Sequence, residues 1–185
     1  MAKKRKTLVK DLTTRGRRIR AQKRHSTSPF WKRKAHCVWS LIVRRGGVCE
    51  LCEAKADTVQ LQAHHLLGKD GNNYPHLRFD LQCGLCVCSR CHKTARCSCH
   101  GNPVWFSAWL LENKPMVYNW VLAHIPDQGI PMPDPYQAYV RLCREAQRLG
   151  LVLAPEDSKR MVELDQQPAA ANLVPVTGGA DPFEP

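Results

Sequence analysis

The chain has 185 residues, of which 43% are apolar, 28 are Lys or Arg and 16 are Asp or Glu, so its formal net charge is +12. This length allows one domain with extensions or two small domains. The charged N-terminus lacks the apolar stretch of a secretory signal, and no apolar run approaches the length of a membrane span. We therefore expect a soluble cytoplasmic protein with no membrane partner, whose ten cysteines bind metal more readily than they form disulfides.

The positive charge is concentrated at the N-terminus. Residues 1–36 contain 14 Lys or Arg and one acid, a balance of +13, whereas residues 37–185 contain 14 Lys or Arg and 15 acids, a balance of −1. A basic arm on a near-neutral domain is typical of proteins that bind nucleic acid through its phosphates. The alternative is a solvated tail or a localisation signal. The predicted nucleic-acid contacts are Lys3, Lys4, Arg5, Lys6, Arg15, Arg17, Arg18, Arg20, Lys23, Arg24 and, further along, Arg78.

Residues 1–29 show no apolar periodicity, and we expect this arm to be disordered. A helix is predicted from Phe30 up to the Gly46-Gly47 pair. Its apolar positions are Trp31, Ala35, Val38, Trp39, Ile42 and Val43. Alternation predicts a half-buried strand over residues 58–64, a loop follows over 66–80, a second short strand covers 84–88, and a helix begins near Ser89.

Asn102-Pro103 and Asp134-Pro135 are predicted helix starts, because Asn and Asp are good N-caps and Pro fits the first turn. The expected apolar face of the first helix is Val104, Trp105, Ala108, Trp109 and Leu111. Pro115 starts a further segment. The helix after Asp134 is expected to end at Gly150 and to bury Tyr136, Tyr139, Val140, Cys143, Ala146 and Leu149. Cys37 and Cys143 occupy apolar helical positions and are predicted core residues.

Two Cys-x2-Cys pairs, Cys49 with Cys52 and Cys88 with Cys91, have the spacing of zinc knuckles. Two such pairs complete a tetrahedral site of four thiolates, which predicts one structural Zn²⁺. The ion would join the segment before the first strand to the start of the following helix, and so hold a region with little core.

The strand over residues 58–64 runs into the adjacent pair His64-His65, and the second knuckle leads directly into His92. The CELC knuckle, the strand ending in AHH, the stretch PHLRFDLQCGLCVCSRCHK and the later FSAW together resemble the HNH endonuclease family, over roughly residues 46–112. Phage and prophage HNH proteins, including NinG-like recombination nucleases, have a similar PHLRFD stretch.

The resemblance implies a ββα-metal (His-Me finger) core and a role for each histidine. His64 and His92 would be ligands of a divalent ion such as Mn²⁺, Mg²⁺, Ni²⁺ or Zn²⁺, and His65 would be the general base. The family's further histidine would fall at His100. The implied activity is hydrolysis of DNA phosphodiester bonds to 5′-phosphate and 3′-hydroxyl ends, in a bacterial or phage-infected cell.

The chain departs from the family pattern at two places. Cys83 stands where the family usually has an Asn that helps to hold the loop carrying the base. The other departure is an insertion with additional cysteines. Two interpretations are open for these residues, a second metal site or free thiols: Cys83, Cys86, Cys97, Cys99 and His100.

The sequence as a whole predicts an α+β fold with a small zinc-stapled core, flanking helices and disordered termini. The predicted parts are a basic arm (1–29), an HNH nuclease domain (30–113), a helical extension (114–153) and a flexible tail (154–185). The predicted partner is double-stranded or branched DNA, and a homodimer is left open. The alternatives to a nuclease are a non-catalytic, zinc-stabilised nucleic-acid-binding protein and a zinc-held protein-interaction module.

Overall fold

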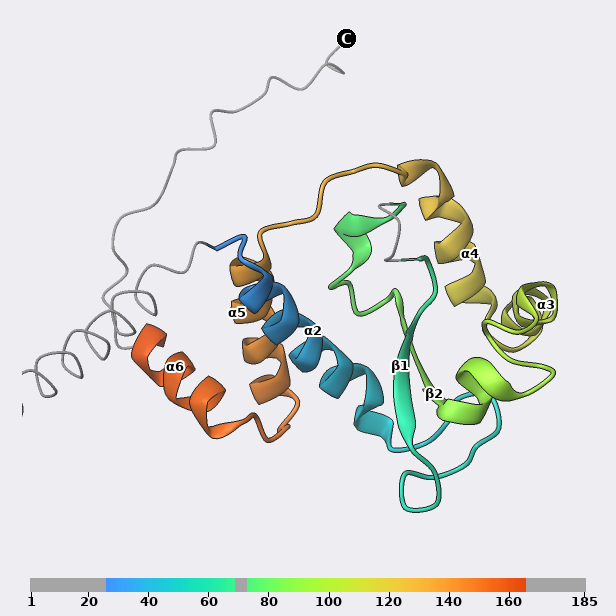
Figure 1. Cartoon of the computed structure of the whole chain (residues 1–185), viewed down its shortest axis with the longest axis horizontal. Helices are drawn as coiled ribbons and strands as arrows, with labels where there is room; N and C mark the ends of the chain where they lie inside the picture. Colours follow the sequence, from blue (N-terminus) through green and yellow to red (C-terminus); the bar gives the residue numbers. More distant parts are fainter. Residues whose placement is uncertain (1–25, 69–72, 166–185) are drawn as a thin grey trace, which may run out of the picture. The chain divides into compact units, whose positions relative to one another are not determined.

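The computed structural model describes residues 26–68 and 73–165, and the chain divides into two compact units, residues 1–153 and 154–185 (Figure 1). The first unit contains α2 (Pro29–Val43), β1 (Leu61–His65), β2 (Gly84–Cys88), α3 (Pro103–Asn113), α4 (Pro115–His124) and α5 (Pro135–Arg148). The second contains α6 (Pro155–Asp165). Helices combined with one antiparallel pair of strands make the fold α+β, as the sequence predicts.

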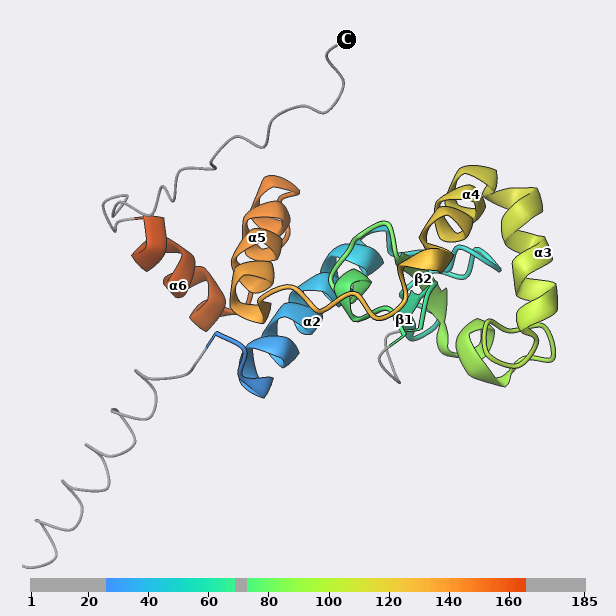
Figure 2. The ribbon, with the colours of Figure 1, turned by 90° about the horizontal axis from the view of Figure 1, so that it is seen from above.

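Helix α2 is the centre of the main core. Its six predicted apolar positions, from Trp31 to Val43, are all buried. The helix packs against α5 on one side and against the two strands on the other (Figures 1 and 2). Its first turn contains Pro29, and the chain leaves it through Gly47, whose φ of 66° is readily adopted only by glycine. The burial pattern predicted from helical spacing is confirmed here.

The strands form an antiparallel hairpin in which Leu61 pairs with Cys88 and His65 pairs with Gly84. The second strand has the predicted bounds, while the first begins at Leu61 and extends through His65. Since successive side chains of a strand point to opposite faces, Gln62 and His64 share one face and His65 lies on the other. The register therefore separates the two adjacent histidines.

The helix expected from Ser89 is only one wide turn, η4 (Arg90–Thr94), in which the Ala95 N–H donates to the Arg90 carbonyl at 2.9 Å. The chain then makes an eight-residue loop before α3. Helix α3 begins as predicted, with the Asn102 side chain accepting from the Trp105 N–H at 3.0 Å. The two strands expected from the resemblance are thus present, whereas the helix expected directly after them is replaced by a turn and a loop that precede α3.

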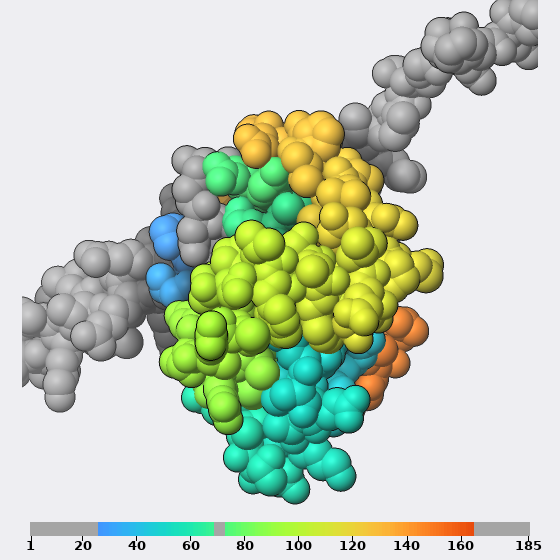
Figure 3. All heavy atoms as spheres, turned by 90° about the vertical axis from the view of Figure 1, so that its right-hand side faces the viewer, coloured from blue at the N-terminus to red at the C-terminus, as the bar shows by residue number. Residues whose placement is uncertain are grey.

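The prediction for the buried face of α3 is wrong. Phe106 and Leu110 are buried, while the predicted face is not: Val104, Ala108 and Leu111 are exposed, and Trp105 and Trp109 are half-buried. Because apolar residues lie on most sides of α3, helical spacing does not identify the face that packs. Helices α3 and α4 pack together and form much of the face shown in Figure 3.

Helix α5 starts at the predicted cap, where Asp134 accepts from the Tyr136 and Gln137 N–H groups, and it ends just before Gly150. Tyr139, Cys143 and Ala146 are buried as predicted; the other three predicted positions, Tyr136, Val140 and Leu149, are half-buried. Cys37 is exposed, so its prediction as a core residue is wrong.

Residues 155–165 of the predicted flexible tail form α6, whose first turn contains Glu156 and Asp157. Acidic side chains there interact favourably with the helix dipole. None of the helices in the described ranges is both long enough and apolar enough to cross a membrane. The predicted arm lies outside the described residues, except for its last four positions.

Candidate metal centres and histidine site

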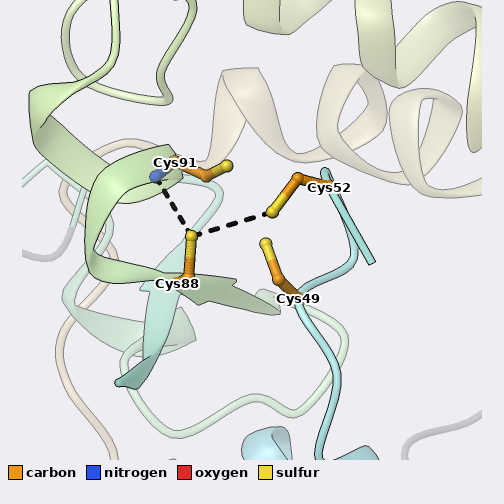
Figure 4. Close-up of side chains that lie close together, drawn as sticks. All are labelled: Cys49, Cys52, Cys88 and Cys91. Atoms are coloured by element: carbon orange, nitrogen blue, oxygen red, sulfur yellow. Dashed lines mark hydrogen bonds between the residues drawn. The ribbon is translucent and has the colours of Figure 1, made fainter. Parts of the chain in front are cut away.

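The two predicted knuckles meet at one point (Figure 4). Cys49 and Cys52 come from the turn after α2, Cys88 ends β2 and Cys91 lies in η4. The four Sγ atoms all lie within 4.8 Å of one another, and the Sγ atoms of Cys52 and Cys88 are 3.8 Å apart. Four thiolates around a tetrahedral Zn²⁺ with Zn–S bonds of about 2.3 Å have sulfur separations of about 3.8 Å. The donor set and its spacing fit a metal ion such as zinc.

The pKa values of the clustered thiols indicate why a cation suits this site. Burial raises the pKa of Cys91, and the neighbouring sulfurs of Cys52 and Cys88 raise it further. The pKa of Cys52 is also raised, first by burial. For Cys49, burial acts in the same direction, but backbone N–H donors outweigh it and bring the pKa to about 7. Four thiolates can ionise together only if a bound cation offsets their repulsion.

Glu50 connects this cluster to the rest of the domain. Its backbone N–H donates to the Cys86 carbonyl at 2.8 Å, and its carboxylate accepts from the Cys86 N–H at 2.8 Å. The same carboxylate lies 2.6 Å from the Lys114 ammonium, between α3 and α4. These contacts join the first knuckle to β2 and to the α3–α4 pair.

A second cluster consists of His64, His92 and His100, whose ligand nitrogens lie within 4.8 Å of one another. The Nε2 atoms of His92 and His100 are 3.1 Å apart, and the His64 ring lies 5.1 Å and 5.0 Å from their rings. His64 is buried, His92 half-buried and His100 exposed, so the cluster opens to solvent on one side. The cavity beside it has a volume of about 610 Å³ and is lined by Ala63, His64, His65, Gly68, His92, Lys93 and His100.

His100 reaches this cluster because the loop after η4 folds back along it. The Cys99 N–H donates to the Cys91 carbonyl at 2.9 Å, and the His100 N–H donates to the His92 carbonyl at 3.2 Å. Gly101 closes the loop against Ser98, whose Oγ would lie 2.6 Å from a Cβ at position 101. The inserted segment thus brings a third imidazole beside the two predicted metal ligands.

Gln62 was not among the predicted site residues. Its Oε1 accepts from the His92 Nδ1–H at 2.5 Å, so the neutral His92 ring carries its proton on Nδ1 and offers Nε2 to an ion. The signal that could have identified it is its position two residues before His64, on the same face of the strand.

His65 lies at the same cavity but has different surroundings. Its Nε2 is 2.9 Å from the Arg78 carbonyl, and since a carbonyl only accepts, Nε2 carries the proton of the neutral ring. The Trp39 indole stacks on the ring at 3.9 Å. From the sequence alone, Trp39 is predicted only as a core residue and Arg78 only as a nucleic-acid contact.

The five residues considered for a second metal site do not come together, although all of them are described. His100 joins the histidine cluster, and Cys97 is exposed. Cys83 is buried among Leu67, Tyr74 and Leu77. Burial raises the pKa of Cys83 and Cys86 to about 11 and that of Cys99 to about 12, which favours the thiol. Of the two interpretations left open, free thiols fit these cysteines better than a second metal site, because Cys83 and Cys86 lie at β2 whereas Cys97 and Cys99 lie in the loop after η4.

The basic residues Lys3 to Arg24 lie outside the described residues, so their predicted contacts are untested by the structure. Arg78 is half-buried. Comparison of the chain with protein-family models, curated proteins and solved structures finds no match.

Proposed function

We propose that the protein is an HNH-type, metal-dependent endonuclease that hydrolyses phosphodiester bonds of DNA. The observation that carries the proposal is the convergence of four histidines on one open cavity, three of them with ligand nitrogens within 4.8 Å of one another. A further support is the order of the parts in the chain, in which a knuckle, the His-His strand, the second strand and the second knuckle resemble the HNH pattern.

The three imidazoles suit a divalent transition ion, because neutral nitrogen donors bind Mn²⁺, Ni²⁺ or Zn²⁺ more readily than Mg²⁺. His64, His92 and His100 would hold it. When bound, the ion supplies Lewis-acid stabilisation of a phosphate oxygen and of the leaving 3′-oxygen. His92 is oriented for this role by Gln62, and the exposed His100 leaves the cavity side open to a phosphodiester.

His65 would be the general base. Its Nε2–H is directed to the Arg78 carbonyl, so Nδ1 is the nitrogen that takes a proton from water. In this neutral tautomer Nδ1 carries a free lone pair, which is what a general base needs in order to accept the proton. The proton moves from the attacking water to Nδ1 as the water oxygen bonds to phosphorus and the bond to the 3′-oxygen breaks.

The four cysteines would hold a structural Zn²⁺, separate from the histidine cluster. Cys91 is followed immediately by His92, so an ion on the knuckle would also fix the turn from which His92 projects. The basic arm would add sequence-independent affinity for DNA phosphates.

A non-catalytic DNA-binding protein is the second candidate, and Cys83 favours it. The family's Asn at this position helps to hold the loop of the base, whereas this chain has a thiol there, whose Sγ lies 3.9 Å from the Leu67 carbonyl. A thiol is a weak donor, so the loop loses support.

Cleavage of supercoiled plasmid with added Mn²⁺ distinguishes the two candidates. Wild type should nick, and His65→Ala should nick about 10²–10⁴-fold more slowly with its DNA affinity retained. His64→Ala should lose activity that excess Mn²⁺ partly restores. His124→Ala is the matched control, since its ring bonds to its own helix at Trp120, and it should behave like wild type. If wild type fails to nick the plasmid with every divalent ion that is tried, the non-catalytic function is the one supported.

A further inference from the structure

Trp39 lies directly against the histidine that we assign as the base. The indole is fully buried and His65 is 9% exposed. Their ring centroids are 3.9 Å apart and their planes are inclined by only 19°. Contact over a full ring face restricts rotation of the imidazole about its side-chain bonds, because any large turn would drive it into the indole.

The same indole also anchors the segment whose carbonyl accepts the hydrogen bond from Nε2, at the edge of the His65 ring. Trp39 Nε1–H donates to the Asp80 carbonyl at 2.8 Å, two residues after the Arg78 carbonyl that accepts from His65. Between them, the Phe79 carbonyl accepts from the Arg141 guanidinium at 3.3 Å. Three consecutive carbonyls are thus each bonded to a side chain from a different element: β1, α5 and α2.

The hairpin leaves space for this arrangement. Gly84 is the cross-strand partner of His65. A Cβ at position 84 would lie 2.4 Å from Val43 Cγ2 and 3.0 Å from Trp39 Cζ2, distances too short for ordinary contact. The absence of a side chain opposite His65 is therefore what admits the indole beneath its ring.

We propose that Trp39 is the positioning residue of His65, and that it supplies the support that Cys83 does not. Stacking sets the plane of the ring, and the bond to Asp80 keeps the Arg78 carbonyl where it fixes the proton on Nε2. The catalytic meaning of this inference rests on the proposed nuclease function, whereas the orientation and tautomer of His65 can be measured without it.

The test compares Trp39→Phe with Trp31→Phe in the zinc-containing full-length chain. Trp31 is the matched control, because it is buried in the same helix but its ring contacts Tyr136 edge-on and Tyr139 at a tilt, and not a histidine. Long-range ¹H–¹⁵N spectra at about pH 8, where ordinary imidazoles are neutral, report the tautomer of each ring. The signals of His65 are assigned by their loss in His65→Ala.

Wild type and Trp31→Phe should show His65 as a single Nε2–H tautomer, and Trp39→Phe should show a mixture. In plasmid cleavage, Trp39→Phe should lower the rate at saturating DNA by about 10- to 100-fold, since displacement of a reacting group by about 1 Å slows a reaction by up to this factor. The DNA concentration that gives half of the maximal rate should be unchanged. Gly84→Ala, whose Cβ would crowd both Val43 and the indole without removing either, should have the same effects and is the second variant if Trp39→Phe folds poorly.

The inference is overturned if Trp39→Phe and Gly84→Ala keep the single tautomer, or if Trp31→Phe loses it equally, because the effect would then be general to the core. If wild type does not cleave DNA, the nuclease function fails, while the tautomer of the two tryptophan variants still decides whether Trp39 positions the ring.

Discussion

The Nδ1–H of His92, in η4, donates a hydrogen bond to Oε1 of Gln62, in β1, at 2.5 Å. The contact defines the tautomer of His92 and directs its Nε2 toward His64 and His100. If the histidine cluster binds a metal ion as proposed, Gln62 would act on it through His92, and this role can be measured in binding experiments.

Gln62→Met should weaken Mn²⁺ binding to the histidine cluster by about 10- to 100-fold, the usual effect of losing a hydrogen bond to a metal-ligating histidine. Calorimetric titration of the zinc-containing protein with Mn²⁺ measures this directly. Gln60→Met, at an exposed position two residues earlier, is the control and should bind like wild type. Equal affinities for the two variants would show that Gln62 does not orient His92.

Protein purified without added metal should contain about one zinc per chain, held by the four cysteines. Cys91→Ser should lose this zinc and unfold at a markedly lower temperature, because ion binding contributes to folding free energy. Elemental analysis and thermal unfolding are the measurements. Cys37→Ser, at an exposed cysteine outside the cluster, should match wild type in both. A well-folded wild type without zinc would contradict the site.

Local sequence patterns predicted the parts of the fold that depend on neighbouring residues. The spacing of apolar residues identified the whole buried face of α2, and the side chains of Asn102 and Asp134 cap their helices as predicted. Knuckle spacing identified the four cysteines that cluster, since a Cys-x2-Cys turn is itself a local structure.

Relationships that depend on tertiary packing were not predictable in this way. His100 joins the histidine cluster only because the loop before α3 folds back on η4, and no spacing rule specifies that path. The buried face of α3 could not be predicted, because apolar residues lie on most sides of this helix. From the sequence, Trp39 is predicted only as a core residue. Its contact with His65 depends on the hairpin register and on the absence of a side chain at Gly84.

Zinc binding should release protons at neutral pH. The pKa values of Cys52 and Cys91 are raised, so both thiols are protonated near pH 7 and must ionise to bind the ion. Zinc affinity should consequently rise with pH, by at least about two logarithmic units per pH unit near neutrality, and zinc should dissociate on acidification. Calorimetry of the apo chain in buffers of different ionisation enthalpy counts the protons. Release of fewer than about two would mean that the thiolates already exist before zinc binds.

Deletion of residues 1–25 should weaken DNA binding irrespective of sequence, while leaving α2 intact. This segment contains 11 Lys or Arg and one acid, Asp11, a balance of +10. If about six of these cations contact phosphates, the slope of log affinity against log salt should be about −5 in the full chain from these contacts, and it should become much shallower after the deletion. Fluorescence anisotropy with two unrelated duplexes, at several salt concentrations, measures both the affinity and the slope.

Deletion of residues 166–185 is the control, since this segment carries Asp181 and Glu184 and no Lys or Arg. Its removal should leave the slope as it is in the full chain, because no cation that could displace condensed counterions has been lost. An unchanged slope after deletion of residues 1–25 would instead assign the arm to localisation or to protein contacts. DNA affinity would then have to come from the cations of residues 26–185, whose 17 Lys or Arg are balanced by 15 acids.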